Sequence, residues 1–410
     1  MQDGVAARLA PLLGRILLGS DQAGNALPIQ VIAWDGSSVG PSDAPAFVIR
    51  HRRALRRLLW KPGEMGLVRA YIAGELDIEG DVFAALRAVQ EVMRSRTESI
   101  RLSSEAKREI VRTAVTLGAV GPEPKPPAEE FPLGAVEDGT LPLEESADFA
   151  ALVLGPSMAH GCAAWPAPSL EAAQRTEYAR ICARLNLRPG MRLLDLSCGW
   201  GAFARYAAEE HGVEAVGLTR SAIQAAYAAQ HGKADIRLGD LDEAGGAPFD
   251  AIVCLGGQAN PDLVAGALHD LLVDGGRLLV QQMTRRPGPH TARRTFTTSY
   301  VFPEGGELRS LGAIADAFEA ADLEVREVTA RREDQAATFR AWAAALQANW
   351  AECAALSSPG RARVWLLYLA ASALACESGH AGYSELTAVR RNPEHPTTSG
   401  ILPGTATLTR

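Results

Sequence analysis

Short apolar runs alternate with longer amphipathic stretches from about residue 148 onward. Runs of this kind are typical of buried strands, and they lie at 192–196, 213–218, 236–238, 250–255, 277–283 and 323–328. A long helical stretch is expected at about 336–378, before a last strand at 384–389. Strands that alternate with helices predict an α/β fold, in which helices cover both faces of a parallel sheet.

A different pattern occupies the first part of the chain. Two strands and two helices are expected there, at 29–34, 46–50, 64–73 and 82–95. Together they predict a small α+β domain over residues 1–96. The composition then changes, because four prolines between 122 and 127 are followed by an acidic stretch. This change predicts a mobile linker over 97–147, which leaves 148–410 as the main domain.

Size and charge narrow the class of protein. A chain of 410 residues has room for two domains. Hydrophobic residues make up 47% and charged residues 22% of the chain, which is typical of a soluble globular protein. The net charge of -7 gives no general attraction to nucleic acid. Residues 51–60 are a local exception, where basic residues are mixed with apolar ones. They fit either a contact with an anionic membrane or a solvated basic helix face.

Cysteine spacing and apolar runs exclude further classes. The six cysteines are scattered, without the CxxC or Cys/His spacing of a zinc site, so we expect neither a metal site nor a disulfide framework. The N-terminus lacks a signal-peptide pattern. No apolar run approaches the roughly 18 residues of a membrane span. We therefore expect a cytoplasmic protein, for which peripheral contact with the inner face of the membrane is compatible.

One motif points to a ligand. An apolar strand ends in Asp195 and runs through Ser197 into the turn Gly199-Trp200-Gly201, and a helix is expected to follow. In an open α/β sheet this arrangement forms a nucleotide-binding crevice at the carboxyl end of the first strand. Gly199 and Gly201 permit close approach of a ligand to the backbone because they carry no Cβ. The alternatives are a tight turn without a ligand and a helix cap made by Asp195.

The second and third strands distinguish between two nucleotide ligands. An NAD site usually places an acid about 20 residues on, at the end of the second strand, but here that strand ends in Thr219-Arg220-Ser221. Gly239-Asp240 follows the third strand. With the glycine turn, this pattern resembles S-adenosylmethionine (SAM) methyltransferases, which implies a contact between Asp240 and the adenine amino group. Otherwise Asp240 is a solvated turn residue. The SAM-binding residues expected from the resemblance are Asp195, Ser197, Gly199, Gly201, Thr219, Gln224 and Asp240.

Segments along nearly the whole chain resemble the cyclopropane-fatty-acyl-phospholipid synthase family of SAM-dependent C-methyltransferases. Residues 58–64 and 71–81 look like the accessory domain of that family, and 154–158 with Cys162 match the segment that folds over SAM. Further matches are 216–224 in the second strand and helix, 300–303 and 306–308 in the lid over the acyl site, and 361–368 in the helical insertion. The resemblance implies a class I SAM-methyltransferase sheet, which is Rossmann-like, with a helical insertion and a small N-terminal α+β accessory domain.

The resemblance also implies a chemistry. In this family the π electrons of an alkene attack the methyl group of SAM, and bound bicarbonate then removes a proton from the resulting carbocation. A cysteine backbone region, a Glu-His pair and a tyrosine hold the bicarbonate. Cys162 and Tyr368 occupy the matching positions, but Ala259 and Asn260 stand where the Glu-His pair belongs. His160 stands at a position that normally contacts SAM, and histidine titrates near neutral pH, so it is the natural substitute. The expected catalytic residues are Cys162, Tyr368 and His160, with Gln258 and Asn260 as further candidates for holding the anion.

Three functions follow from these observations, and we favour the first. It is C-methylation of the double bond in an unsaturated acyl chain of a phospholipid, or of a related hydrophobic substrate, with a rearranged proton acceptor. The second is methylation of oxygen or nitrogen in a specialised metabolite, because such nucleophiles need neither a carbocation nor bicarbonate. The third is a non-catalytic lipid-binding or partner subunit. For the N-terminal domain we expect lipid engagement, self-association as a homodimer, or a purely structural role.

Overall fold

The computed structural model describes residues 4–18, 29–94, 104–132, 145–246, 248–256, 262–288, 294–303 and 308–391. The chain forms two compact units. The first comprises Met1–Ser157, Gly288–Glu307 and Glu333–Ala381, and the second comprises Met158–Pro287, Leu308–Arg332 and Gly382–Arg410. These units divide the chain differently from the predicted domain boundaries, which stay a prediction.

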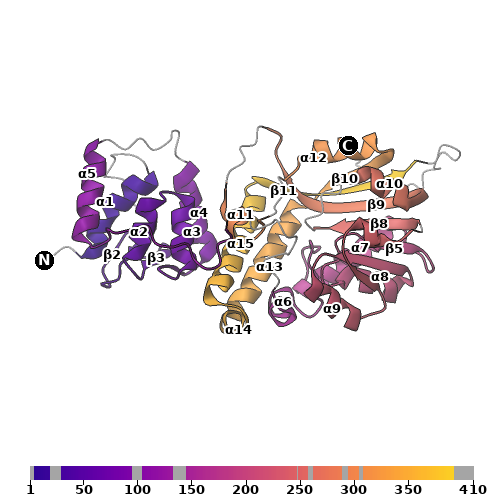
Figure 1. Cartoon of the computed structure of the whole chain (residues 1–410), viewed down its shortest axis with the longest axis horizontal. Coiled ribbons are helices and arrows are strands. Elements are labelled where there is room, and N and C mark those ends of the chain that lie inside the picture. The colour runs from indigo at the N-terminus through magenta and orange to yellow at the C-terminus, as the bar shows by residue number, and fades with distance from the viewer. Residues whose placement is uncertain are drawn as a thin grey trace, which may run out of the picture. The chain divides into compact units, whose positions relative to one another are not determined.

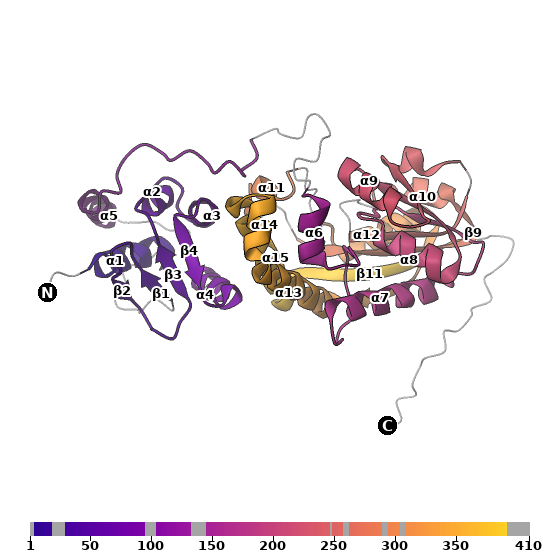
Figure 2. The ribbon, with the colours of Figure 1, turned by 90° about the horizontal axis from the view of Figure 1, so that it is seen from below.

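The first unit contains a small sheet with strand order β2-β1-β3-β4. Its strands are β1 (Gln30–Ile32), β2 (Ser38–Val39), β3 (Ala46–Ile49) and β4 (Leu76–Glu79). The helices labelled around this sheet in Figure 2 are α1 (Val5–Leu18), α2 (Arg53–Trp60), α3 (Glu64–Ile72), α4 (Val82–Arg94) and α5 (Ser104–Thr116). Apolar side chains of α1, α2, β1 and β3 share one buried core. The two strands and two helices expected in this region are thereby confirmed.

The segment expected to be a mobile linker is different from the prediction over residues 104–132. It contains α5, and the proline-rich part that follows is hydrogen-bonded to the helices of the same unit. Arg57 donates to the carbonyl of Lys125 at 2.8 Å, and Arg69 makes two hydrogen bonds of 2.7 Å to Glu130. The side chain of Trp60 donates to the carbonyl of Gly121. These long-range partners satisfy backbone groups that proline-rich composition alone leaves unpaired.

The basic run at 51–60 forms α2, and part of its charge is used inside the unit. Arg57 is buried and makes hydrogen bonds of 2.8 and 3.2 Å to the buried carboxylate of Glu75. Arg56 donates to the carbonyls of Ala119 and Val120. The run is therefore neither a purely solvated face nor a uniform basic surface, although its first residues and Trp60 are exposed.

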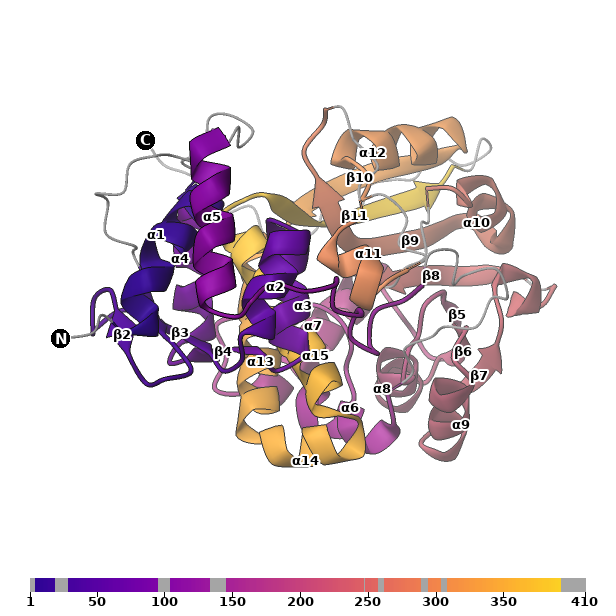
Figure 3. The same ribbon diagram turned by 60° about the vertical axis from the view of Figure 1, so that its left-hand side comes forward.

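A second group of helices completes the first unit. They are α6 (Ala147–Leu154), α11 (Phe296–Tyr300), α13 (Arg332–Ala348), α14 (Trp350–Leu356) and α15 (Pro359–Glu377), and Figure 3 draws α13–α15 in orange and yellow. The helical stretch predicted at 336–378 is thus confirmed as three helices. Among the helices in the described ranges, none is long and apolar enough to cross a membrane.

The second unit is built on a seven-stranded sheet with strand order β10-β11-β9-β8-β5-β6-β7. The strands are β5 (Arg192–Asp195), β6 (Glu214–Thr219), β7 (Asp235–Leu238), β8 (Phe249–Leu255), β9 (Leu272–Arg285), β10 (Leu323–Ala330) and β11 (Ala381–Arg390). Strands β5 to β9 run parallel, whereas β10 and β11 are antiparallel to each other. This topology confirms the predicted α/β fold.

Helices cover both faces of this sheet (Figure 1). They are α7 (Leu170–Leu185), α8 (Ala202–His211), α9 (Ala222–Gln230), α10 (Ala265–Leu271) and α12 (Leu311–Ala320), with the short 3₁₀ turn η1 (Leu241–Ala244) after β7. Successive strand residues point to opposite faces: Leu193 packs in the core with α7 and α8, and Leu194 in the core with α10 and α12. The central strands are apolar throughout because both of their faces are buried.

Candidate functional site

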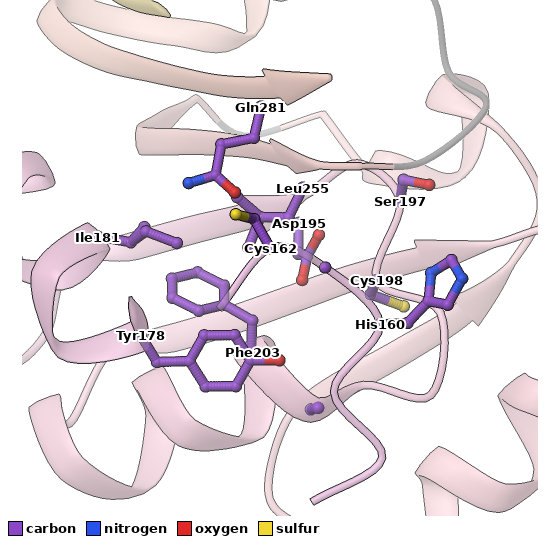
Figure 4. A pocket seen from close by; sticks show the side chains of 12 residues that line it. His160, Cys162, Tyr178, Ile181, Asp195, Ser197, Cys198, Phe203, Leu255 and Gln281 are labelled. Atoms are coloured by element: carbon purple, nitrogen blue, oxygen red, sulfur yellow. The ribbon is translucent and has the colours of Figure 1, made fainter. Parts of the chain in front are cut away.

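A topological switch point lies at β5. This strand is flanked by β6 on one side and by β8 on the other, and all three run parallel. In open α/β sheets, ligands bind outside the carboxyl ends of the strands at such a point. A cavity lies there, and Figure 4 shows it from close by. Its walls come from β5, β8 and β9, from α7 and α8, and from residues 160–162.

Asp195 is the buried acid of this cavity. It ends β5, is 1% exposed, and lines the cavity together with Ser197. Burial raises the pKa of Asp195 to about 7, although the Ser197 backbone N–H favours the charged form. Within the described part of the chain, no donor reaches its Oδ1 atom. A buried carboxylate oxygen without a partner is suited to a cationic ligand.

The glycine turn is held open by its backbone conformation. Gly199 and Gly201 have φ values of +54° and +75°, in the left-handed region that disfavours other residues. A Cβ on Gly201 would lie 3.0 Å from the Cβ of Ala228. The N–H of Cys198 donates to the carbonyl of Leu218, which ties the turn to β6. The turn therefore presents backbone at the start of α8 without side chains in the way.

The remaining expected SAM residues lie at the ends of the two neighbouring strands. The hydroxyl of Thr219, at the end of β6, donates to Oε1 of Gln224 at 2.7 Å. Asp240 follows β7, and its exposed carboxylate lies 3.7 Å from Arg220. These residues do not line the cavity, but the carboxyl ends of β5, β6 and β7 meet at one edge of the sheet. Asp195 and Ser197 thus share the cavity, while Thr219, Gln224 and Asp240 continue along that edge.

His160 and Cys162 join Asp195 in the cavity. A Cβ on Gly199 would lie 3.9 Å from the Cβ of His160, so His160 stands beside the glycine turn. The surrounding protein desolvates the imidazolium and lowers the pKa of His160 below its ordinary value, although the residue keeps an exposed surface. His160 is therefore neutral at pH 7. Cys162 is buried in the wall of the cavity.

Tyr368 belongs to the first unit. It lies on α15 with its ring centroid 5.5 Å from that of Phe302, 6.1 Å from Phe339 and 5.9 Å from Trp365. Burial raises the pKa of Tyr368 to about 12, so its phenol is a hydrogen-bond donor at neutral pH and not a base. Its expected role together with Cys162 stays a prediction. Gln258, Ala259 and Asn260 lie outside the described residues.

Sequence reasoning missed one polar group of the cavity, Gln281 on β9. Its amide lines the cavity and donates to two buried carboxylates, Glu177 on α7 and Glu385 on β11. The signal was present as the pair Gln281-Gln282 inside an otherwise apolar strand run. A polar residue on a doubly buried strand requires a partner, but the sequence does not show which partner it has.

Comparison with known proteins identifies the family. The sequence profile described as mycolic acid cyclopropane synthetase matches residues 136–385. The chain belongs to this family. The probable fatty acid methyltransferase Rv3720 of Mycobacterium tuberculosis is 33% identical to this cyclopropane synthetase family member over 394 residues, covering 89% of this chain and 92% of the relative. A probable fatty acid methyltransferase of Pseudomonas putida is 29% identical over 388 residues, with 89% and 92% covered.

Solved structures of the cyclopropane synthetase family match the methyltransferase part. The cyclopropane synthase MmaA2 from Mycobacterium tuberculosis is 26% identical with a TM-score of 0.54, covering 60% of this chain and 94% of that one. The mycolic acid cyclopropane synthase CmaA1, complexed with SAH and CTAB, is 29% identical with a TM-score of 0.54 and the same two coverages. The predicted family is confirmed, and the chain is a SAM-dependent methyltransferase of the cyclopropane synthase family. The unpartnered Asp195 oxygen and the open glycine turn fit the cationic cofactor.

Proposed function

We propose that this enzyme transfers a methyl group from SAM to the double bond of an unsaturated acyl chain of a phospholipid. The observation that carries the proposal is the cavity at the switch point, which combines the unpartnered Asp195 oxygen with a largely apolar wall. Relatives named as fatty acid methyltransferases and as cyclopropane mycolic acid synthases support an acyl acceptor.

SAM supplies a methyl group on a positively charged sulfur. Asp195 offers its oxygen to a positive charge of the cofactor, and the open turn at Gly199 and Gly201 brings backbone groups to it. We assign Thr219 and Gln224 to the ribose side and Asp240 to the adenine side, because they follow at the same edge of the sheet. These contacts fix the orientation of the methyl group, which is the main way such a site accelerates the transfer.

The apolar wall keeps water away from the reacting carbons. The rings of Tyr178 and Phe203 meet at 5.3 Å, and Ile181 and Leu255 continue this wall. The π pair of the alkene forms the new carbon–carbon bond while the sulfur–methyl bond breaks, and the acyl cation then loses a proton. Water in the cavity would trap this cation, so a dry wall is required for ring or branch formation.

We assign the proton to His160, which is neutral at pH 7 and lies in the cavity. Bicarbonate held near Cys162, with the phenol of Tyr368 as donor, is the alternative acceptor that the family resemblance implies. Replacement of His160 by glutamine distinguishes the two. A drop in kcat of at least about tenfold with an unchanged Kd for SAM supports His160 as the acceptor, at the magnitude of general-base catalysis. Activity that depends on added bicarbonate but not on His160 contradicts this assignment.

The acyl chain and its membrane need apolar contacts outside the cofactor cavity. In the first unit, Tyr368, Phe302 and Trp365 form an aromatic cluster that suits an acyl chain. Trp60 is 51% exposed and Val120 is 55% exposed, close to exposed basic residues of α2. This combination supports peripheral contact with an anionic lipid surface. Self-association as a homodimer stays a prediction.

The test is a mass-spectrometric lipid profile of a bacterial host that is rich in unsaturated phospholipid and expresses this chain. We expect acyl chains heavier by one CH₂ unit, which are absent when Gly199→Asp is expressed instead. That control places a side chain on a residue with a φ of +54° and a second carboxylate beside Asp195. An unchanged profile from folded, SAM-binding protein contradicts the acyl acceptor. Methylation of hydroxyl- or amine-bearing compounds would then identify the heteroatom alternative, and SAM binding without transfer the non-catalytic one.

A further inference from the structure

Two buried carboxylates meet behind the cofactor cavity. Glu177 on α7 is 0% exposed and Glu385 on β11 is 1% exposed. Arg180 bridges them, donating to Glu177 at 3.0 Å and to Glu385 at 2.8 Å. Arg331 adds a hydrogen bond of 2.8 Å to Glu177, and Arg184 approaches Glu385 at 3.2 Å. Such a buried ionic cluster is a weak source of stability, so its value lies in what it positions.

The member of this cluster that faces the cavity is Gln281. Its Nε2 donates at 2.5 Å to Glu177 and at 2.6 Å to Glu385, which uses both amide hydrogens. The Arg180 hydrogen bonds outweigh the effect of burial and keep the pKa of Glu385 below its ordinary value, so this carboxylate is ionised and only accepts. The reverse amide orientation would place Oε1 against two carboxylate oxygens. The cluster therefore fixes the oxygen end of Gln281 toward the cavity, where Figure 4 shows it turned toward Cys162.

Gln281 is thus a second acceptor in a cavity that already contains the unpartnered Oδ1 of Asp195. The backbone also fixes the place of Gln281, because its carbonyl accepts a hydrogen bond of 2.7 Å from the N–H of Gly256 at the end of β8. An amide oxygen that cannot rotate away favours positive charge in front of it and gives nothing to a neutral group.

We propose that Gln281 is a specificity-determining residue whose oriented carbonyl oxygen favours the positively charged cofactor SAM over its neutral-sulfur product S-adenosylhomocysteine (SAH). The inference rests on the proposed function and deepens it. Transfer of the methyl group removes the positive charge from the sulfur, so the same oxygen loses its favourable partner when the reaction is complete. Glu177 and Glu385 are positioning residues in this account, because they act through Gln281. The consequence is that the cavity releases product more readily than it releases the loaded cofactor.

The experiment measures Kd for SAM and for SAH by calorimetry, without acyl substrate. In Gln281→Met, which keeps the length of the side chain but removes its oxygen, we expect SAM to bind about tenfold more weakly while SAH changes less than about twofold. The matched control is Gln282→Met, the same change on the opposite face of β9 at a residue that is 5% exposed. It should leave the SAM/SAH ratio unchanged.

Folding is monitored by the thermal midpoint, because Gln281→Met removes one donor from each carboxylate. If that variant does not fold, Gln281→Asn withdraws the oxygen from the cavity with the amide retained, and the same loss of SAM preference is expected. An equal change in the affinities for SAM and SAH in the folded variant overturns the inference and leaves the proposed function standing. Wild-type protein that binds neither compound overturns the proposed function as well.

Discussion

Protonation of Asp195 should control the affinity for SAM. The carboxyl is buried at the end of β5, burial raises its pKa to about 7, and its Oδ1 has no donor in the described part of the protein. A cation placed before Asp195 favours the ionised form and lowers this pKa. Binding therefore requires ionised Asp195 and becomes stronger as the pH rises toward and through 7.

The magnitude follows from the fraction of ionised Asp195 in the free enzyme. With a pKa of about 7, about 3% is ionised at pH 5.5 and about half at pH 7. Because the apparent Kd scales inversely with the competent fraction, SAM should bind about 15-fold more weakly at pH 5.5 than at pH 7. At pH 7 the binding of one SAM molecule should release about half a proton, since that fraction of Asp195 must ionise.

Titration calorimetry at the two pH values, in buffers of different ionisation enthalpy, measures both quantities. An α-amino group has an ordinary pKa of about 8, so SAM keeps its ammonium charge over this range. His160 also titrates near the site, and Asp195→Asn retains that contribution while removing the carboxylate. We expect the variant to lose most of the pH dependence and to bind more weakly at pH 7. A wild-type Kd that changes less than about twofold, without proton release, would refute the reasoning.

Two further predictions concern packing. A side chain on Gly217 of β6 would place its Cβ 2.9 Å from the Sγ of Cys198 in the turn. Gly217→Val should therefore lower the free energy of unfolding by about 1–3 kcal/mol and weaken SAM binding, whereas Gly266→Ala, with open space around it, should do neither; equal effects in denaturant titrations would contradict this. Arg57→Leu leaves the buried Glu75 carboxylate without its main partner and should cost about 3–5 kcal/mol. Replacing both residues by leucine should cost less than the sum of the two single changes, and additive losses in the double-mutant cycle would contradict a coupled pair.

Local patterns in the sequence determined much of the fold. The apolar runs specified the central strands because a doubly buried strand must be apolar on both faces, and β5, β6 and β8 appear where these runs lie. The cofactor edge was equally local, because Asp195, Ser197 and the glycine turn are neighbours in the chain. The linker prediction did not hold over 104–132, because Arg57 and Arg69 supply hydrogen bonds to that segment from helices far away in the sequence.

Only the tertiary structure decided what surrounds the cavity. Glu177 and Glu385 meet because strand order brings β11 beside β9, and nothing near either residue in the sequence indicates the other. The orientation of Gln281 depends on both carboxylates at once, and so does its chemical meaning as an acceptor. Hydrophobic periodicity is a property of neighbouring residues, whereas the pairing of buried polar groups depends on how distant segments pack. The sequence therefore determined where the cofactor edge lies, and the packing decided which polar atoms line the cavity.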